Sequence, residues 1–247
     1  MPVLNGEEME TQKLPNGHYG YSATRLENLG AAEYTLVTVV SDVSGSVQPF
    51  TGEMEKALSA IVQACKMSPR GNNLLIRLVT FADHLQETHG YKLLDRCHTA
   101  DYSGILTANG STALFDAAEN AVSAATAQAQ QMKDAGYAVN GIVFVITDGM
   151  DNASRLSITD LRRSLEKAAR GGAIESLVSV LIGVNVRDNG VSAYLRKLQT
   201  DAGFTQYVEL GRADAGTLAR LADFVSRSIS LQSTALGSGG ASHPLTF

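Results

Sequence analysis

The sequence YTLVTVVSDVSGS, residues 34–46, joins an almost unbroken apolar run to a short polar turn. Residues 34–40 predict a strand buried on both faces of a sheet, because aliphatic and β-branched residues follow one another with few interruptions. The polar residues that begin at Ser41 and Asp42 then lie at the carboxyl end of that strand. Open parallel sheets bind ligands at this edge, so the stretch predicts a buried strand with a site beside it.

Further apolar runs alternate with longer segments whose apolar residues recur at helical spacing. The runs cover residues 74–81, 142–147, 177–184 and 206–210. Residues 83–101 interrupt the alternation, and His89-Gly90 between the short runs 85–88 and 91–94 predicts a hairpin or an edge strand there. We therefore predict a Rossmann-like, doubly wound α/β fold with a mainly parallel six-stranded sheet, one antiparallel edge strand, and helices on both faces.

The segments between these runs are amphipathic. Their apolar spacing predicts helices over residues 54–65, 114–125, 158–168, 191–198 and 218–229. Ser157 followed by Asp160 resembles a capping box and marks the start of the third helix. A helix in each gap between strands is what the doubly wound fold requires.

The 247 residues are enough for one well-buried core. We predict an N-terminal extension over 1–30, one domain over 31–231, and a flexible C-terminal tail over 232–247. The extension contains PNG at 15–17 and the tail contains GSGG at 237–240, both typical of turns and linkers.

Aromatic and apolar residues near both ends have two interpretations. They are Tyr19, Tyr21, Leu245 and Phe247. Termini most often pack such residues onto their own domain, and we favour that interpretation. Docking of a partner or of a second copy is the alternative.

Charge and cysteine content exclude several classes of partner. The formal net charge is -5, and acidic and basic residues are interspersed without a basic stripe, so we predict no nucleic-acid partner. Residues 1–13 lack the apolar run of a secretory signal, and no stretch approaches the roughly 20 apolar residues that span a bilayer. Cys65 and Cys97 cannot build a disulfide framework. We predict a cytoplasmic protein without a membrane partner.

Three polar clusters lie where the fold would gather them. The loop after the first strand carries Asp42, Ser44 and Ser46, Thr112 precedes a helix, and Asp148 follows the strand at 142–147. Together they offer two carboxylates and three hydroxyls, and hard divalent cations take oxygen ligands. We predict that these five residues bind a metal, with Mg2+ as the cation and Mn2+ or Ca2+ as alternatives.

The chemistry of these clusters favours binding over catalysis. With few charged ligands, a cation held there stays electrophilic and is able to accept a carboxylate from another molecule. No His, Lys or Cys in the clusters is placed as an obvious base. We therefore predict a protein-binding module and no enzyme.

The motifs resemble those of a known family. The sequence DVSGS at 42–46 resembles the D-x-S-x-S motif of the von Willebrand factor A family, and Thr112 and Asp148 match its second and third elements. The resemblance covers residues 34–229 in the order and approximate spacing of that family. It implies a metal-ion-dependent adhesion site, or MIDAS.

By this resemblance each residue of the site has a role. Ser44, Ser46 and Thr112 would ligate the cation directly, whereas Asp42 and Asp148 would act through water or in alternation with direct contact. The segment GSTALFD at 110–116 also resembles soluble, intracellular members more than integrin inserted domains.

The resemblance also places Asp116 and Asp151 around the metal, behind its ligands or at the rim of the site.

The same resemblance implies a function. Stand-alone bacterial members often work beside AAA-type ATPases, kinases or stress-response systems. We therefore expect an intracellular adaptor or assembly factor that binds an Asp or Glu carboxylate of its partner.

Two other classes use the same residues. A Mg2+-dependent phosphohydrolase or phosphotransferase of the haloacid dehalogenase type also places an Asp after its first strand. Such enzymes resemble D-x-D there, whereas Ser44 replaces the second acid here. A purely structural domain with an empty site is the third class, and it predicts no effect of Mg2+ or Mn2+ on stability.

Other site types are disfavoured. His84, His89 and His98, with Cys97 nearby, are a candidate zinc cluster, but their spacing matches no zinc pattern and a polar surface hairpin explains them. The nucleophile elbow G-x-S-x-G and the glycine-rich nucleotide-binding motifs are absent from the sequence.

Overall fold

The computed structural model describes residues 9–14, 19–236 and 245–247. Its strands are β1 Met9–Lys13, β2 Gly20–Thr24, β3 Glu33–Asp42, β4 Leu74–Phe81, β5 Leu85–Leu93, β6 Ala138–Thr147, β7 Leu177–Val184 and β8 Gln206–Leu210. Within these residues the strands form one sheet in the order β1-β2-β5-β4-β3-β6-β7-β8. Strand β3, predicted from residues 34–40, therefore lies in the interior of the sheet and pairs in parallel with β4 and β6.

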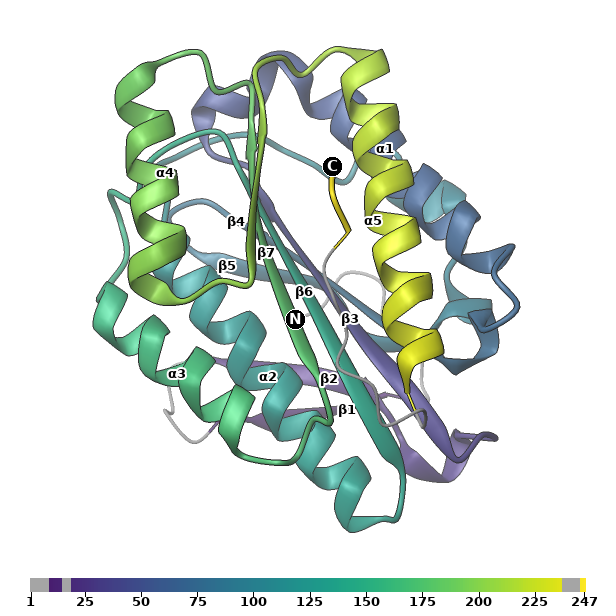
Figure 1. Ribbon diagram of the computed structural model, residues 1–247. Helices are drawn as coiled ribbons and strands as arrows, with labels where there is room; N and C mark the ends of the chain where they lie inside the picture. Colours follow the sequence, from purple (N-terminus) through teal and green to yellow (C-terminus); the bar gives the residue numbers. More distant parts are fainter. Residues whose placement is uncertain (1–8, 15–18, 237–244) are drawn as a thin grey trace.

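Helices cover both faces of the sheet, as predicted (Figure 1). They are α1 Thr51–Lys66, α2 Leu114–Asp134, α3 Ile158–Arg170, α4 Asn189–Ala202 and α5 Ala215–Ala235. Helices α1 and α5 pack against one face, and α2, α3 and α4 against the other. The predicted capping box is present: the Ser157 hydroxyl accepts from the backbone N–H of Asp160, and the Asp160 carboxylate accepts from that of Ser157.

Each face of the sheet has its own apolar core because strand residues alternate between the two sides. In β3, Leu36 and Val40 belong to the core under α2, whereas Val37 and Val39 belong to the core under α1 and α5. All four are at most 3% exposed. A strand with no exposed face cannot show polar alternation, which is why the sequence reads as a continuous apolar run.

The prediction of six strands with one antiparallel edge strand is wrong. The described sheet has eight strands and two antiparallel pairs, β1 with β2 and β4 with β5. Strand β5 is not an edge, because β2 pairs with it in parallel at Ala23 and Tyr91. The two additional strands lie in residues 1–30, which the sequence assigned to an extension. Strand β1, METQK, is exposed or half-buried throughout, so it has no apolar run to reveal it.

Of the two predictions for the segment around His89-Gly90, a hairpin or an edge strand, the hairpin is wrong, and the segment is one strand in the interior of the sheet. Both residues are buried in the middle of β5. A Cβ atom on Gly90 would lie 2.0 Å from the carbonyl oxygen of Ser22. The glycine therefore marks a close approach of β2 to β5 and not a turn.

The ends of the described chain pack onto the domain. Helix α5 continues to Ala235, beyond the predicted limit at residue 231. The Leu245 carbonyl accepts a hydrogen bond of 2.8 Å from the Gln206 side chain, and the Phe247 ring packs edge-on against Phe224. The turn at 15–17 and the glycine-rich segment at 237–240 lie outside the described residues.

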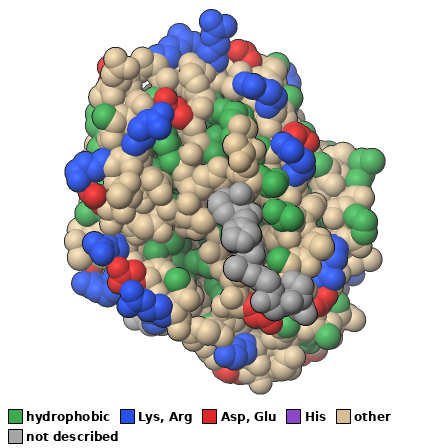
Figure 2. Space-filling model, in the orientation of Figure 1, with side chains coloured by type: hydrophobic (Ala, Val, Ile, Leu, Met, Phe, Trp, Pro, Cys, Tyr) green, Lys and Arg blue, Asp and Glu red, His purple; other side chains and the backbone are tan. Residues whose placement is uncertain are grey.

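The surface agrees with the charge pattern of the sequence. Figure 2 shows Lys and Arg side chains interspersed with Asp and Glu over the face it presents. Among the residues that the structure describes, no helix is both long and apolar enough to cross a membrane.

Candidate metal centre

The predicted site lies where the direction of the chain through the sheet reverses. Asp42 ends β3 and Thr147 ends the neighbouring strand β6. After β3 the chain continues to β4 on one side of β3, and it later returns to β6 on the other side. This is the topological switch point at which doubly wound sheets bind ligands, so three loops converge there.

Asp42 is fully buried and anchors the site. Its Oδ1 accepts a hydrogen bond of 2.7 Å from the backbone N–H of Ser44, and its Oδ2 accepts one of 2.7 Å from the Thr147 hydroxyl. Burial raises the pKa of Asp42 to about 6, and the negative charge of Asp148 adds to the rise. The carboxyl thus ties the loop after β3 to the end of β6.

A chain of hydrogen bonds links the other predicted oxygens of these two loops. The Ser44 and Ser46 hydroxyl oxygens are 3.2 Å apart, and the Ser46 hydroxyl donates a bond of 2.8 Å to Oδ1 of Asp148. Burial raises the pKa of Asp148 as well. Asp42, Ser44, Ser46 and Asp148 therefore lie together at this edge of the sheet.

Thr112 is brought to the same edge by its backbone. Its N–H donates a bond of 2.7 Å to the Asn152 side chain, and its carbonyl accepts from the N–H of Asn152 at 3.0 Å. Two backbone hydrogen bonds join this loop to the first: the Gly45 N–H donates to the Gly110 carbonyl at 3.1 Å, and the Asn109 N–H donates to the Val43 carbonyl at 2.8 Å. Thr112 is only 5% exposed, and its hydroxyl enters none of these bonds.

Gly110 is required by the shape of this loop. Its φ angle is +80°, and an added Cβ would lie 2.5 Å from Oδ2 of Asp83. The Asp83 carboxylate accepts a bond of 2.7 Å from the N–H of Ser111. Sequence reasoning missed the roles of Asp83, Asn152 and Thr147, because single polar residues in a loop or at a strand end carry no motif.

Asp116 and Asp151 support the start of α2. Asp151 accepts hydrogen bonds from the Phe115 N–H, at 3.2 Å, and from the Ser154 hydroxyl. Asp116 is buried and accepts a bond of 2.9 Å from the N–H of Leu156. Both acids hold the loop after β6 against the helix that follows Thr112, so they act on the position of the site.

The donor set fits a hard divalent cation. Carboxylate and hydroxyl oxygens are the ligands that Mg2+, Mn2+ and Ca2+ prefer. The Ser44–Ser46–Asp148 chain gathers three side-chain oxygens that such a cation would take as ligands. With both Asp42 oxygens accepting hydrogen bonds, the free coordinating capacity lies mostly in hydroxyls and Asp148.

The candidate zinc cluster does not form. His84 and His98 are exposed, whereas His89 is buried and its ring nitrogens bond to the Gly90 carbonyl and the Tyr102 hydroxyl, each at 2.9 Å. Burial lowers the pKa of His89 to about 4. In the described part of the chain, no three His, Cys, Asp or Glu side chains form a group that could hold a metal ion.

Sequence comparison finds no relative: no family model matches the chain, and no curated protein matches it. Solved structures do match. The PilB minor pilin of Streptococcus sanguinis has a TM-score of 0.58 at 16% identity, with 85% of this chain and 64% of the pilin covered. The pilus adhesin SpaC of Lactobacillus rhamnosus GG has a TM-score of 0.57 at 11% identity, with 92% and 36% covered.

A third match carries the motif in its description. Proximal thread matrix protein 1 from the mussel byssus, described with a zinc-occupied MIDAS motif, has a TM-score of 0.53 at 17% identity. The alignment covers 83% of this chain and 47% of that protein, so this chain spans under two thirds of all three structures. At such identities the likeness shows the fold alone. The chain therefore has a von Willebrand factor A-like fold.

Proposed function

We propose that this chain is a divalent-cation-dependent protein-binding domain. In the proposal one Mg2+ is held by Asp42, Ser44, Ser46, Thr112 and Asp148, and a partner supplies an Asp or Glu carboxylate. The observation that carries it is the hydrogen-bonded chain from Ser44 through Ser46 to Asp148, which gathers oxygens from two loops at the switch point of the sheet.

The residues of the site divide into anchors and ligands. Asp42 holds two segments of backbone and sets their spacing, and Asn152 fixes the backbone of Thr112. Ser46 is exposed, which leaves the site open to a second protein. A bound cation would supply a positive centre for that protein's carboxylate. Because only two of the five proposed ligands, Asp42 and Asp148, are acidic, the cation would keep part of the positive charge that such binding needs.

A groove beside the site supports an acidic partner. It has a volume of about 860 Å3 and is lined in part by Pro49, Phe50, Arg187 and Arg212. The first two belong to the 3-10 helix η2, Gly45–Phe50, which also carries Ser46. Two exposed arginines outnumber the one acidic residue of the lining, Asp214, so the groove complements a segment with further acidic residues.

The competing proposal is a Mg2+-dependent phosphohydrolase or phosphotransferase with Asp42 as nucleophile. The geometry disfavours it, because Asp42 is 0% exposed and both its carboxylate oxygens accept hydrogen bonds. A nucleophile must reach the substrate with a free oxygen.

The adaptor proposal also includes a cytoplasmic setting and a partner from an AAA-type ATPase or kinase system.

Calorimetric titration with MgCl2, MnCl2 and CaCl2 tests the site directly. The wild type should bind one cation, Asp148→Ala should bind none, and Asp134→Ala, an exposed acid on α2, should bind as the wild type does. If Asp148→Ala retains full affinity, the proposed ligand set is wrong.

Capture from native lysate then tests the function. Proteins bound by the wild type in Mg2+, and lost both in chelator and with Asp148→Ala, are the expected result. Metal-dependent hydrolysis of p-nitrophenyl phosphate that disappears in Asp42→Ala would instead support the enzyme.

A further inference from the structure

A second cavity, of about 290 Å3, opens between the antiparallel strands β1 and β2, the neighbouring strands β4 and β5, and the first half of α2. Thr11, Gly20 and Gln86 line it and are exposed, so they form its opening. Arg77 and Asn120 also line it and are at most 2% exposed, so they form its floor. No residue of the candidate metal centre contributes to it.

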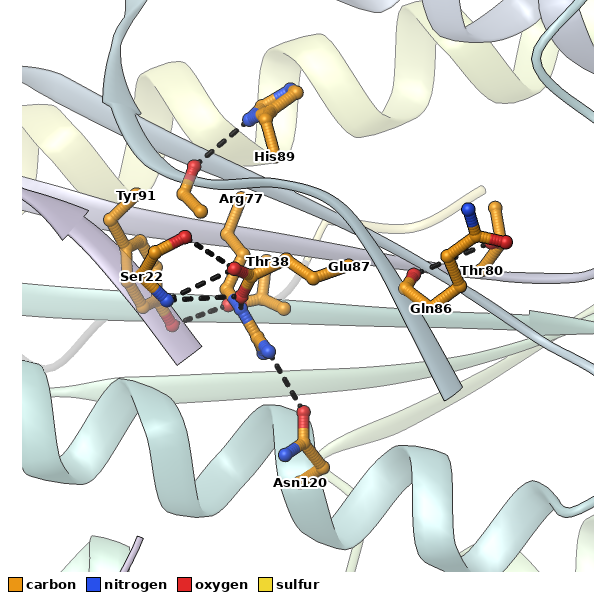
Figure 3. Close-up of polar contacts among 10 residues, drawn as sticks. Ser22, Thr38, Arg77, Thr80, Gln86, Glu87, His89, Tyr91 and Asn120 are labelled. Atoms are coloured by element: carbon orange, nitrogen blue, oxygen red, sulfur yellow. Dashed lines mark hydrogen bonds and ion pairs between the residues drawn. The ribbon is translucent and has the colours of Figure 1, made fainter. Parts of the chain in front are cut away.

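Arg77 is the polar centre of this floor (Figure 3). Its Nε donates a bond of 2.6 Å to Oε2 of Glu87, and its Nη2 donates one of 2.9 Å to Oδ1 of Asn120. Within the described residues its Nη1 is buried and has no hydrogen-bond partner, and the same holds for the hydroxyl of Tyr21. Buried donors without acceptors are rare and costly in folded proteins.

The acceptors of the floor are already in use. Glu87 accepts from Arg77 through Oε2, and through Oε1 from both the backbone N–H and the hydroxyl of Ser22. The Asn120 oxygen accepts from Arg77, so that residue can offer only its amide N–H groups. A molecule that satisfies this floor must therefore bring acceptor oxygens.

The charges of the floor argue against an anion. The positive charge of Arg77 is balanced by Glu87 at 2.6 Å. Tyr19, which lines the cavity, donates its hydroxyl to the buried carboxylate of Asp116 at 3.2 Å, so a second negative group lies behind the lining. An anion would lose its hydration and gain no net attraction, whereas an uncharged carbonyl would not carry that cost.

The walls of the cavity are apolar. Val79 is 1% exposed and Leu85 is half-buried, and the Tyr19 side chain lies beside them in the same lining. Small-molecule sites combine such walls with a few placed polar groups. We propose that this cavity binds a small uncharged molecule that presents a carbonyl oxygen to Arg77 and packs an apolar or aromatic body against Val79 and Leu85.

Saturation-transfer NMR with two probes of one shape tests this proposal. Benzamide carries an uncharged carbonyl on an aromatic ring, and benzoate carries a carboxylate on the same ring. We expect benzamide to bind at millimolar concentration and at least about tenfold more tightly than benzoate. Chelator should not change the signal, which separates this cavity from the proposed metal site.

Variants at the opening locate the binding. Thr11→Trp and Gln86→Trp, on opposite sides of the opening, should each abolish the benzamide signal. Thr200→Trp, an exposed threonine on α4, is the matched control and should retain it.

Thr11 lies in β1 and Gln86 lies in β5. A local disturbance of β1 by Thr11→Trp therefore cannot explain a loss of binding in Gln86→Trp. No benzamide signal in the wild type, a signal that survives Gln86→Trp, or equal binding of benzoate would each overturn the proposal.

Discussion

The candidate metal centre and the Arg77 cluster, which consists of Arg77, Glu87, Asn120 and Ser22, are both built from polar side chains around the same sheet. They differ in how the sequence encodes them. At the candidate metal centre Asp42 ends the buried strand β3, and Ser44 and Ser46 follow it within four residues. The Arg77 cluster joins residues that are 10 to 65 positions apart. The candidate metal centre takes most of its residues from one short segment at the edge of the sheet. The Arg77 cluster forms only when β2, β4, β5 and α2 have packed together.

The two regions should also differ in what they contribute. The metal centre is open at Ser46 and has carboxyls whose pKa values are raised, so without a cation it is not optimised for stability. The Arg77 cluster is mostly buried and pairs the guanidinium with Glu87. We expect changes to the cluster to alter folding and changes to the centre to alter binding.

The largest expected effect is on folding. In Arg77→Ala the Glu87 side chain, 13% exposed, loses its partner at 2.6 Å, and the free energy of unfolding should fall by about 3–5 kcal/mol. Urea denaturation measures this. Arg162→Ala, which removes an exposed pair with Glu166, should leave the free energy of unfolding almost unchanged. If both variants lose the same free energy of unfolding, the buried Arg77 pair contributes no more to stability than an exposed ion pair does.

The second effect belongs to the metal centre. A cation that binds only the folded state stabilises it by mass action, so Mg2+ at about 100 times its Kd should raise the free energy of unfolding by about 2.7 kcal/mol. Asp148→Ala should remove this gain while changing the metal-free stability little. A gain that persists in Asp148→Ala would place the cation elsewhere.

The third effect sharpens the comparison through pH. The folded pKa of Asp42 is raised from 3.8 to about 6, so its proton stabilises the metal-free fold below the lower value, and this contribution is lost as pH rises through the higher one. A cation competes with that proton, so Mg2+ affinity should fall about tenfold per unit below pH 6. Calorimetry between about pH 7.5 and pH 5 measures this. A flat profile would show that Asp42 is not coupled to the cation.

The smallest effect concerns the groove beside the centre. Arg187→Ala and Arg212→Ala should each weaken capture of a Mg2+-dependent partner about three- to fivefold, because exposed charges add little to affinity. Neither should change Mg2+ affinity. If both leave capture unchanged, the partner does not use this groove.

The order of elements was predictable because it depends on local periodicity. The five apolar runs each become a strand, and the capping pair Ser157 and Asp160 marks the start of α3. The first two strands were not predictable, because METQK at 9–13 is mostly exposed and GYSAT at 20–24 is too short to show a period. His89 and Gly90 suggested a turn because the sequence gives no sign of the close contact between Gly90 and Ser22.

Asp42, Ser44 and Ser46 lie within five residues at the end of a buried strand. The sequence alone therefore determined that their side-chain oxygens are available to a cation. The tertiary structure decided that Asp148 bonds to Ser46, that Thr112 is held by Asn152, and that Arg77 meets Glu87. The physical reason is the separation in sequence of the residues that interact. Hydrophobic periodicity is a property of neighbouring residues, whereas a hydrogen bond between distant residues depends on how the strands and helices pack.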